Sequence, residues 1–185
     1  MNLRPATLED LDLLVRVDLE DEGVTPGHRN GWLPEEFQAH REQIASFIDD
    51  ADKGSFVADL PNEPSVGLIL WRYRNLNEER LGPTHVFSQI RGVLPPSGIF
   101  SEIFQLWVAP RFRRMGIGTA LKVAVEAAAR ERGVEMVYTH TEARNAHVIE
   151  LNKKLGYREV RRGAIWDSIT RVSLVKDLRI PADSA

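Results

Sequence analysis

A basic, glycine-containing segment, RFRRMGIGT from Arg111 to Thr119, holds the first residues whose types and spacing could do chemistry. The apolar residues after it recur with helical spacing, so the segment should lead into the start of a helix. The first N–H groups of a helix have no intrahelical partner, and glycine lets a ligand come close to the backbone. Arg113 and Arg114 add positive charge. The combination predicts a polyphosphate site that binds mainly through the main chain, although a solvated basic turn has the same composition.

The spacing excludes the two familiar nucleotide-binding loops. A Walker loop has Lys and then Ser or Thr after its second glycine, and here Thr119 and Ala120 follow. The dinucleotide motif G-x-G-x-x-G needs a third glycine where Leu121 stands. The remaining pattern is R-x-x-G-x-G, from Arg113 to Gly118, after an apolar strand that ends in LWVAP.

A second segment, NAHVIELNKKLGY from Asn145 to Tyr157, begins with Asn and ends with Lys-x-Gly-aromatic. In this order, the two segments resemble motif A and the later helix of the GCN5-related N-acetyltransferase (GNAT) family. The resemblance is good from Gly98 to Tyr157 and can be extended over the whole chain. It implies acetyl-CoA as co-substrate, with its pyrophosphate held by the loop amides. The cofactor-binding residues that it implies are Trp107, Val108, Arg113, Arg114, Met115, Gly116, Ile117, Gly118, Thr119, Asn145 and Asn152.

Asn152 is a departure from the family pattern. Many members have a tyrosine there, which protonates the CoA thiolate, and an amide cannot replace a phenol as an acid. Asn152 could still donate a hydrogen bond to the sulfur or to the pantetheine. A thiol pKa is about 8.5, so a thiolate can also leave unprotonated near neutral pH. We therefore do not expect Asn152 to abolish activity.

The resemblance implies direct transfer of the acetyl group from the thioester to an amine. The chain has no cysteine and no G-x-S-x-G motif, so no covalent relay is expected. By resemblance, the main-chain N–H of Val108 would stabilise the oxyanion, in a strand that diverges from its neighbour. Pro110 cannot donate to a sheet ladder, so strand pairing should end near it.

Glu102 is the predicted general base. It lies six residues before Val108, where histone-type members of the family have their catalytic glutamate. Strand alternation places it on one face with Phe104 and Leu106, and apolar surroundings favour the protonated form of a carboxyl group. An exposed glutamate at a strand end is the equally weighted alternative. Glu142, at the end of the next strand, is the second candidate.

The other polar and aromatic residues give weaker signals. His140 and His147 lack a recognisable ligand spacing, so no metal site is expected, and His40 should lie at the edge of the core. Trp32 lies in a loop that commonly borders the acceptor site in the resembled family. The acidic run from Asp18 to Gly23 could attract a cationic amine, although a solvated loop face is the simpler interpretation.

Composition limits the class of protein. The chain has 185 residues, of which 43% are hydrophobic, so we expect one globular domain over residues 1–185. The net charge of -3 argues against a general nucleic-acid binder. No apolar run is long enough to span a membrane, and the N-terminus lacks the pattern of a signal peptide, so a cytoplasmic protein is expected. Dimerisation through the last strands stays open.

These residues must be positioned by a mixed α/β (α+β) sheet with helices on both faces. The expected strands are 1–4, 54–60, 65–73, 99–109, 134–141, 157–162 and 164–176, with the last two turning near Gly163 and another strand near 84–90. Helices are expected after Thr7, from Pro34, from Ile117 to Gly133 and over Asn145–Leu155. By resemblance this is the GNAT fold, a mostly antiparallel sheet of six to seven strands.

The sequence thus predicts an acetyl-CoA-dependent N-acetyltransferase acting on a primary amine of a small molecule or peptide. One rival is a non-catalytic module that binds acyl-CoA, which Asn152 favours and Glu102 opposes. A second rival is an O-acyl or longer-acyl transferase on the same fold. The segments that should form the acceptor pocket, 18–32, 76–97 and the closing hairpin, carry no recognisable signature.

Overall fold

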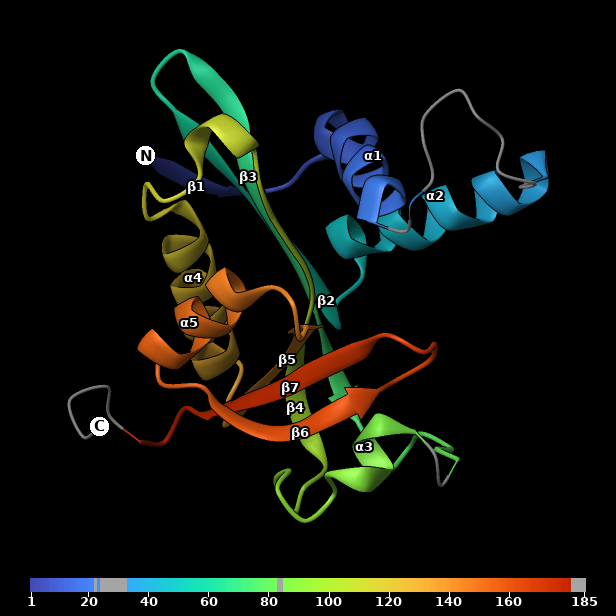
Figure 1. Cartoon of the computed structure of the whole chain (residues 1–185). Helices are drawn as coiled ribbons and strands as arrows, with labels where there is room; N and C mark the ends of the chain where they lie inside the picture. The colour runs from blue at the N-terminus through green and yellow to red at the C-terminus, as the bar shows by residue number, and fades with distance from the viewer. Residues whose placement is uncertain (22, 24–32, 83–84, 181–185) are drawn as a thin grey trace. The chain divides into compact units, whose positions relative to one another are not determined.

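The computed structural model describes residues 1–21, 23, 33–82 and 85–180. Its strands are β1 (Asn2–Pro5), β2 (Lys53–Leu60), β3 (Glu63–Asn75), β4 (Ile99–Val108), β5 (Met136–Glu142), β6 (Arg158–Ala164) and β7 (Thr170–Asp177). Its helices are α1 (Leu11–Asp21), α2 (Pro34–Asp49), α3 (Val86–Gln89), α4 (Ile117–Glu131) and α5 (Ala146–Lys154), with 3₁₀ turns η1 (Leu8–Asp10) and η2 (Pro110–Phe112). Figure 1 shows these elements along the chain.

The strands form one seven-stranded sheet in the order β1-β2-β3-β4-β5-β7-β6. β4 and β5 are parallel, with Glu102 opposite Tyr138, and the pairs β1–β2, β2–β3, β5–β7 and β6–β7 are antiparallel. The predicted mixed, mostly antiparallel sheet is therefore confirmed.

The chain divides into two compact units, each built from two stretches of sequence. The first contains residues 1–72 and 104–121, and the second contains residues 73–103 and 122 onward. The boundaries fall inside β3, β4 and α4, so no linker separates the units.

In the first unit, helices cover both faces of β3. Figure 1 shows α1 and α2 side by side, and their apolar residues form one cluster with β2 and with Leu68 and Leu70 of β3. Gly67, directly before Leu68, faces the opposite side of the strand because strand residues alternate. A Cβ built on Gly67 would lie 2.8 Å from Ile117 and 3.3 Å from Leu121 of α4, so only glycine lets the start of this helix pack so closely.

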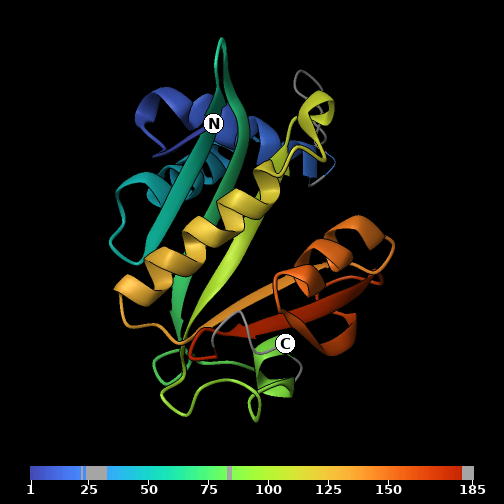
Figure 2. The ribbon, with the colours of Figure 1, turned by 90° about the vertical axis from the view of Figure 1, so that its left-hand side faces the viewer.

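In the second unit, the core is aromatic. The ring of Phe87 in α3 lies 5.0 Å from both Phe100 of β4 and Tyr138 of β5, in edge-to-face contacts. The Tyr138 hydroxyl lies 3.1 Å from Ser173 Oγ of β7, and burial raises the pKa of Tyr138. Figure 2 shows β5 and β7 side by side, in agreement with their register from Met136↔Asp177 to Glu142↔Arg171.

Several predicted details are wrong. In the segment expected to be a strand near 84–90, Val86–Gln89 form the short helix α3 instead, because Val86, Phe87 and Ile90 are buried at helical spacing. The β6–β7 turn follows Ala164, whereas Gly163 lies within β6. The helical spacing of apolar residues predicts that Leu8 and Phe37 are buried, but they are 70% and 43% exposed.

The buried faces of the helices also differ from those that the apolar spacing predicts. In α5 that spacing places Val148, Leu151 and Leu155 inward, but the structure buries Ile149 and Asn152 most completely and leaves Val148 and Leu151 half-buried. The apolar stripe of α4 is flanked by two buried charged residues, Lys122 and Glu126.

Candidate active site

The arginine–glycine loop has the backbone shape that a tight strand-to-helix connection requires. After β4, Pro110 starts the η2 turn, and the chain then passes through Arg114 at φ 64° and Gly116 at φ 81°. A Cβ on Gly116 would meet nothing within 4 Å, so its conformation, rather than crowding, calls for glycine. The first helical bond runs from Ala120 N–H to Gly116 C=O, which leaves the earlier amides of α4 outside the helical ladder.

The arginines of this loop make different contacts. Arg113 donates from Nε to the Val108 carbonyl at 3.1 Å, which holds the loop against the end of β4. Arg111 forms an exposed ion pair with Glu63 at 2.5 Å and lies over the Phe112 ring. Arg113, Arg114 and Met115 are exposed, while Ile117 is buried, so Ile117 can offer a ligand only its main chain.

Strand pairing of β4 ends near Pro110, as predicted. Ala109 N–H donates to Val66 C=O of β3 at 2.9 Å, and Pro110 leaves the strand directly afterwards. Trp107 is half-buried, packs against the core cluster of the first unit and lies 6.0 Å below the Arg16 guanidinium. The Trp107 side chain therefore has a packing role.

Asn145 and Asn152 lie in the second unit, at the two ends of α5. Asn145 is the N-cap, with its Oδ1 accepting from Val148 N–H at 3.4 Å. Asn152 is fully buried, and neither Oδ1 nor Nδ2 has a hydrogen-bond partner among the described residues. Because an unsatisfied buried amide costs about 1–3 kcal/mol, Asn152 is a polar group suited to a ligand or a water.

Lys122 was not predicted from the sequence. It is 1% exposed, its Nζ has no hydrogen-bond partner among the described residues, and it lies 4.8 Å from the Tyr157 ring centre. Burial lowers the pKa of Lys122 to about 7, against the opposing attraction of Glu126. Glu126 itself forms a buried ion pair with Lys176 at 2.6 Å.

Glu102 is buried in β4, so it is not the exposed strand-end glutamate of the alternative interpretation. Its surroundings differ from the predicted apolar ones, because Glu102 Oε2 lies 3.3 Å from Nη1 of Arg74 in β3. Arg74 also pairs with Glu79 in the segment that follows β3. No periodic pattern marks Arg74 or Glu79, which is why the sequence did not reveal them.

The other residues that the sequence singled out lie in varied surroundings. Glu142 pairs with Arg144, and His140 in β5 lies edge-on to the Trp166 ring at 5.2 Å. Asp18 is buried in α1, 3.1 Å from His40, so this part of the acidic run is not a solvated loop. Trp32 lies outside the described residues.

Among the described residues, no group of three or more His, Asp or Glu side chains could hold a metal ion. The helices of this part of the chain are too short or too polar to span a membrane.

Comparison with known proteins identifies the class that this fold and loop define. Residues 21–157 match the model of the acetyltransferase (GNAT) family, and the chain belongs to this family. It resembles an N-alpha-acetyltransferase of Sulfurisphaera tokodaii, with 27% identity over 164 residues that cover 86% of this chain and 81% of that protein. An N-alpha-acetyltransferase of Sulfolobus acidocaldarius is 26% identical over 86% of this chain and 80% of its own length.

Solved structures agree on the fold. NAA60 of Arabidopsis thaliana in complex with acetyl-CoA matches with a TM-score of 0.70 and 20% identity, over 96% of this chain and 98% of that chain. A ribosomal-protein-alanine N-acetyltransferase from Brucella melitensis matches with a TM-score of 0.63 and 23% identity, over 96% and 99%. These structures confirm the predicted GNAT fold. The predicted N-acetyltransferase activity is confirmed by the family match and the two N-alpha-acetyltransferase relatives.

Proposed function

We propose that this N-acetyltransferase moves the acetyl group of acetyl-CoA to the α-amino group of a polypeptide. The observation that carries the acceptor class is the likeness to two N-alpha-acetyltransferases across 86% of the chain. The loop after β4 supports the donor, because exposed arginines and the first amides of α4 suit a pyrophosphate.

We assign the pyrophosphate to the main chain of residues 113–119, with Arg113 and Arg114 adding charge. Arg113 also fixes the loop by its bond to the Val108 carbonyl. The Val108 N–H is proposed as the oxyanion donor. Asn152 is proposed to hydrogen-bond the sulfur or the pantetheine, because its buried amide has no partner among the described residues.

In the reaction the acceptor nitrogen loses two protons, and a C–S bond is replaced by a C–N bond. The acceptor ammonium loses its first proton to Glu102, directly or through a water, and the free amine attacks the thioester carbonyl carbon. The new C–N bond forms and the C–S bond breaks. The nitrogen releases its second proton to the departing thiolate or to water, so that CoA leaves as the thiol or as the thiolate. An α-amino group has a pKa of about 7.7–8.0, so it needs less help from a base than a lysine, whose pKa is about 10.4.

The acceptor class is tested by thiol release from acetyl-CoA in the presence of matched peptides. One peptide has a free N-terminus and no lysine, one has a blocked N-terminus and one lysine, and a small polyamine represents non-peptide acceptors. We expect turnover with the first alone, with the acetyl group on its α-nitrogen by mass spectrometry. Preference for either of the other two would overturn the acceptor assignment. Binding of acetyl-CoA without turnover on any acceptor would favour the non-catalytic module.

The base is tested by Glu102→Gln, which keeps the shape of the side chain and removes its basicity. We expect kcat/KM to fall by about 10²–10⁴-fold at neutral pH, with the Kd of CoA nearly unchanged. The deficit should shrink at high pH, where the free amine is already abundant. Superimposable pH–rate profiles of the two proteins would place the base elsewhere, and Glu142→Gln and His140→Gln are then the next variants.

A further inference from the structure

Arg74 joins Glu102 to a second carboxylate. Its Nη1 donates to Glu102 Oε2 at 3.3 Å, and its Nη2 donates to Oε2 of Glu79. The two carboxylates therefore contact different nitrogens of one guanidinium, and all three residues belong to the second unit.

The Arg74 guanidinium also contacts an aromatic ring. Its carbon lies 5.1 Å from the centre of the Phe87 ring in α3, a distance at which a cation is attracted to an aromatic face. The Arg74 side chain is only 15% exposed and that of Glu102 only 7%, so solvent screens their contact weakly. Two carboxylates and one aromatic ring thus surround the Arg74 guanidinium.

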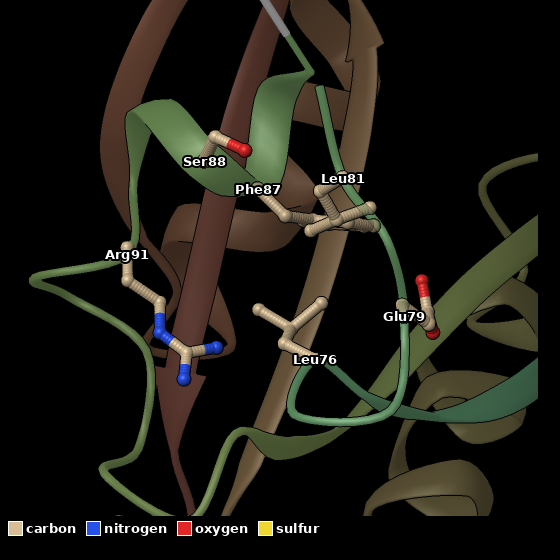
Figure 3. Close-up of a pocket in the computed structure, with 6 residues that line it drawn as sticks. All are labelled: Leu76, Glu79, Leu81, Phe87, Ser88 and Arg91. Atoms are coloured by element: carbon tan, nitrogen blue, oxygen red, sulfur yellow. The ribbon is translucent and has the colours of Figure 1, made fainter. Parts of the chain in front are cut away.

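Glu79 and Phe87 face a shallow pocket of about 320 Å³, lined also by Leu76, Leu81, Ser88 and Arg91. Figure 3 shows Glu79 and Arg91 on opposite sides of this pocket, with Leu76 between them. Glu79, which holds Arg74, therefore lies in the accessible wall of a pocket, whereas Glu102 is buried.

We propose that Arg74 is a positioning residue for acetyl transfer, which orients the Glu102 carboxylate while Glu79 anchors Arg74 from the pocket wall. This inference rests on the proposed role of Glu102 as base. A guanidinium is suited to the task because its planar fork can meet two carboxylates at once, whereas the ammonium of a lysine is a point charge on a flexible stem. Proton transfer requires the base within hydrogen-bond reach of the amine, so a reoriented carboxylate loses rate even where both substrates bind normally.

The test is a double-mutant cycle with Arg74→Met and Glu102→Gln, using the acceptor peptide found above. Arg74→Met alone should lower kcat by about 10- to 100-fold, the range expected when a reacting group is misplaced by about 1 Å, without changing the KM for acetyl-CoA. The same substitution in the Glu102→Gln background should cost almost nothing, because no base remains to be oriented. Glu79→Ala should give a smaller fall in kcat that also disappears in the Arg74→Met background.

In this cycle, either of two outcomes would overturn the inference and leave the proposed function intact. One is wild-type kcat in Arg74→Met while Glu102→Gln is impaired. The other is an equal loss from Arg74→Met in both backgrounds, which would mean that Arg74 supports the fold rather than the base. Wild-type kcat in Glu79→Ala would show that Glu79 is not needed to hold Arg74 in place. If Glu102→Gln itself is fully active, or no acceptor turns over, the proposed function fails and this inference fails with it.

Arg74→Lys provides a second test in case Arg74→Met does not fold. It keeps the positive charge between the two carboxylates but loses the fork, so we expect a folded protein with an intermediate loss of kcat. That loss should also vanish in the Glu102→Gln background. A folded Arg74→Lys variant with wild-type kcat would show that charge alone suffices and would overturn the orienting role.

Discussion

Asn152 and Lys122 are both buried polar residues with side-chain atoms that lack a hydrogen-bond partner among the described residues. Such groups are uncommon in folded proteins because each loses its hydrogen bonds to water. The two residues differ in what they can do. An amide stays neutral and can only exchange hydrogen bonds, whereas an amine can also release its proton.

Asn152→Ala should lower kcat/KM modestly, by the equivalent of one hydrogen bond worth roughly 0.5–1.5 kcal/mol. The substitution removes an amide that has no hydrogen-bond partner among the described residues, so no hydrogen bond of the described structure is lost with that side chain. Steady-state kinetics with acetyl-CoA and a Kd for CoA are the measurements. A loss of several orders of magnitude in kcat with intact CoA binding would instead make Asn152 essential to the chemistry.

Lys122→Met should stabilise the protein, most strongly at or below pH 7. The folded-state pKa of Lys122 is about 7, whereas an unfolded lysine keeps about 10.4, so the unfolded state binds more protons between these values. Stability of the wild type should therefore rise as pH increases from about 7 towards 10. Below pH 7 both states are protonated, and the cost of burying the charge is fully present.

Urea unfolding from pH 6 to pH 10 measures this difference. The gain in Lys122→Met should shrink steadily above pH 7. Lys154→Met, which removes an exposed lysine from the end of α5, is the matched control and should keep the wild-type pH dependence. Parallel stability curves for wild type and Lys122→Met would show that folding does not lower the pKa of Lys122.

At the scale of elements, the loop between β4 and α4 is where sequence and structure agree best. Gly118→Val should weaken CoA binding by an order of magnitude or more, because a branched side chain would block the approach of the pyrophosphate to the main chain. Gly92→Val is the control, since its Cβ would meet nothing within 4 Å and the residue lies between α3 and β4, away from the first turn of α4 that contains Gly118. Calorimetric titration with CoA gives both Kd values. An unchanged Kd in a folded Gly118→Val protein would remove the loop from the CoA site.

The elements show where a sequence pattern carries information and where it does not. Glycine and proline positions predicted the start of α2 at Pro34 and the end of β4 at Pro110, because these residues restrict the backbone locally. The apolar run near Val86 was wrongly predicted to be a strand, since a buried strand and a short buried helix have similar composition. Arg74 could not be predicted, because its partners Glu79 and Glu102 are brought together only by the fold.

At the scale of the molecule, the order of strands and helices was predictable, but the division into two compact units was not. A boundary in sequence normally appears as a linker, and here each boundary lies inside a strand or a helix. We therefore retain the single domain over residues 1–185 as a proposal.

That proposal predicts one cooperative unfolding transition. β3, β4 and α4 each contribute residues to both units, so melting either unit breaks hydrogen-bonded elements that the other unit needs. Differential scanning calorimetry should show a single peak whose calorimetric and van't Hoff enthalpies agree. Far-ultraviolet circular dichroism and tryptophan fluorescence should give coincident transitions, because Trp71 and Trp107 report from the first unit and Trp166 from the second. Two resolved calorimetric peaks, with fluorescence changing in both, would mean that the units unfold independently and that the chain contains two domains.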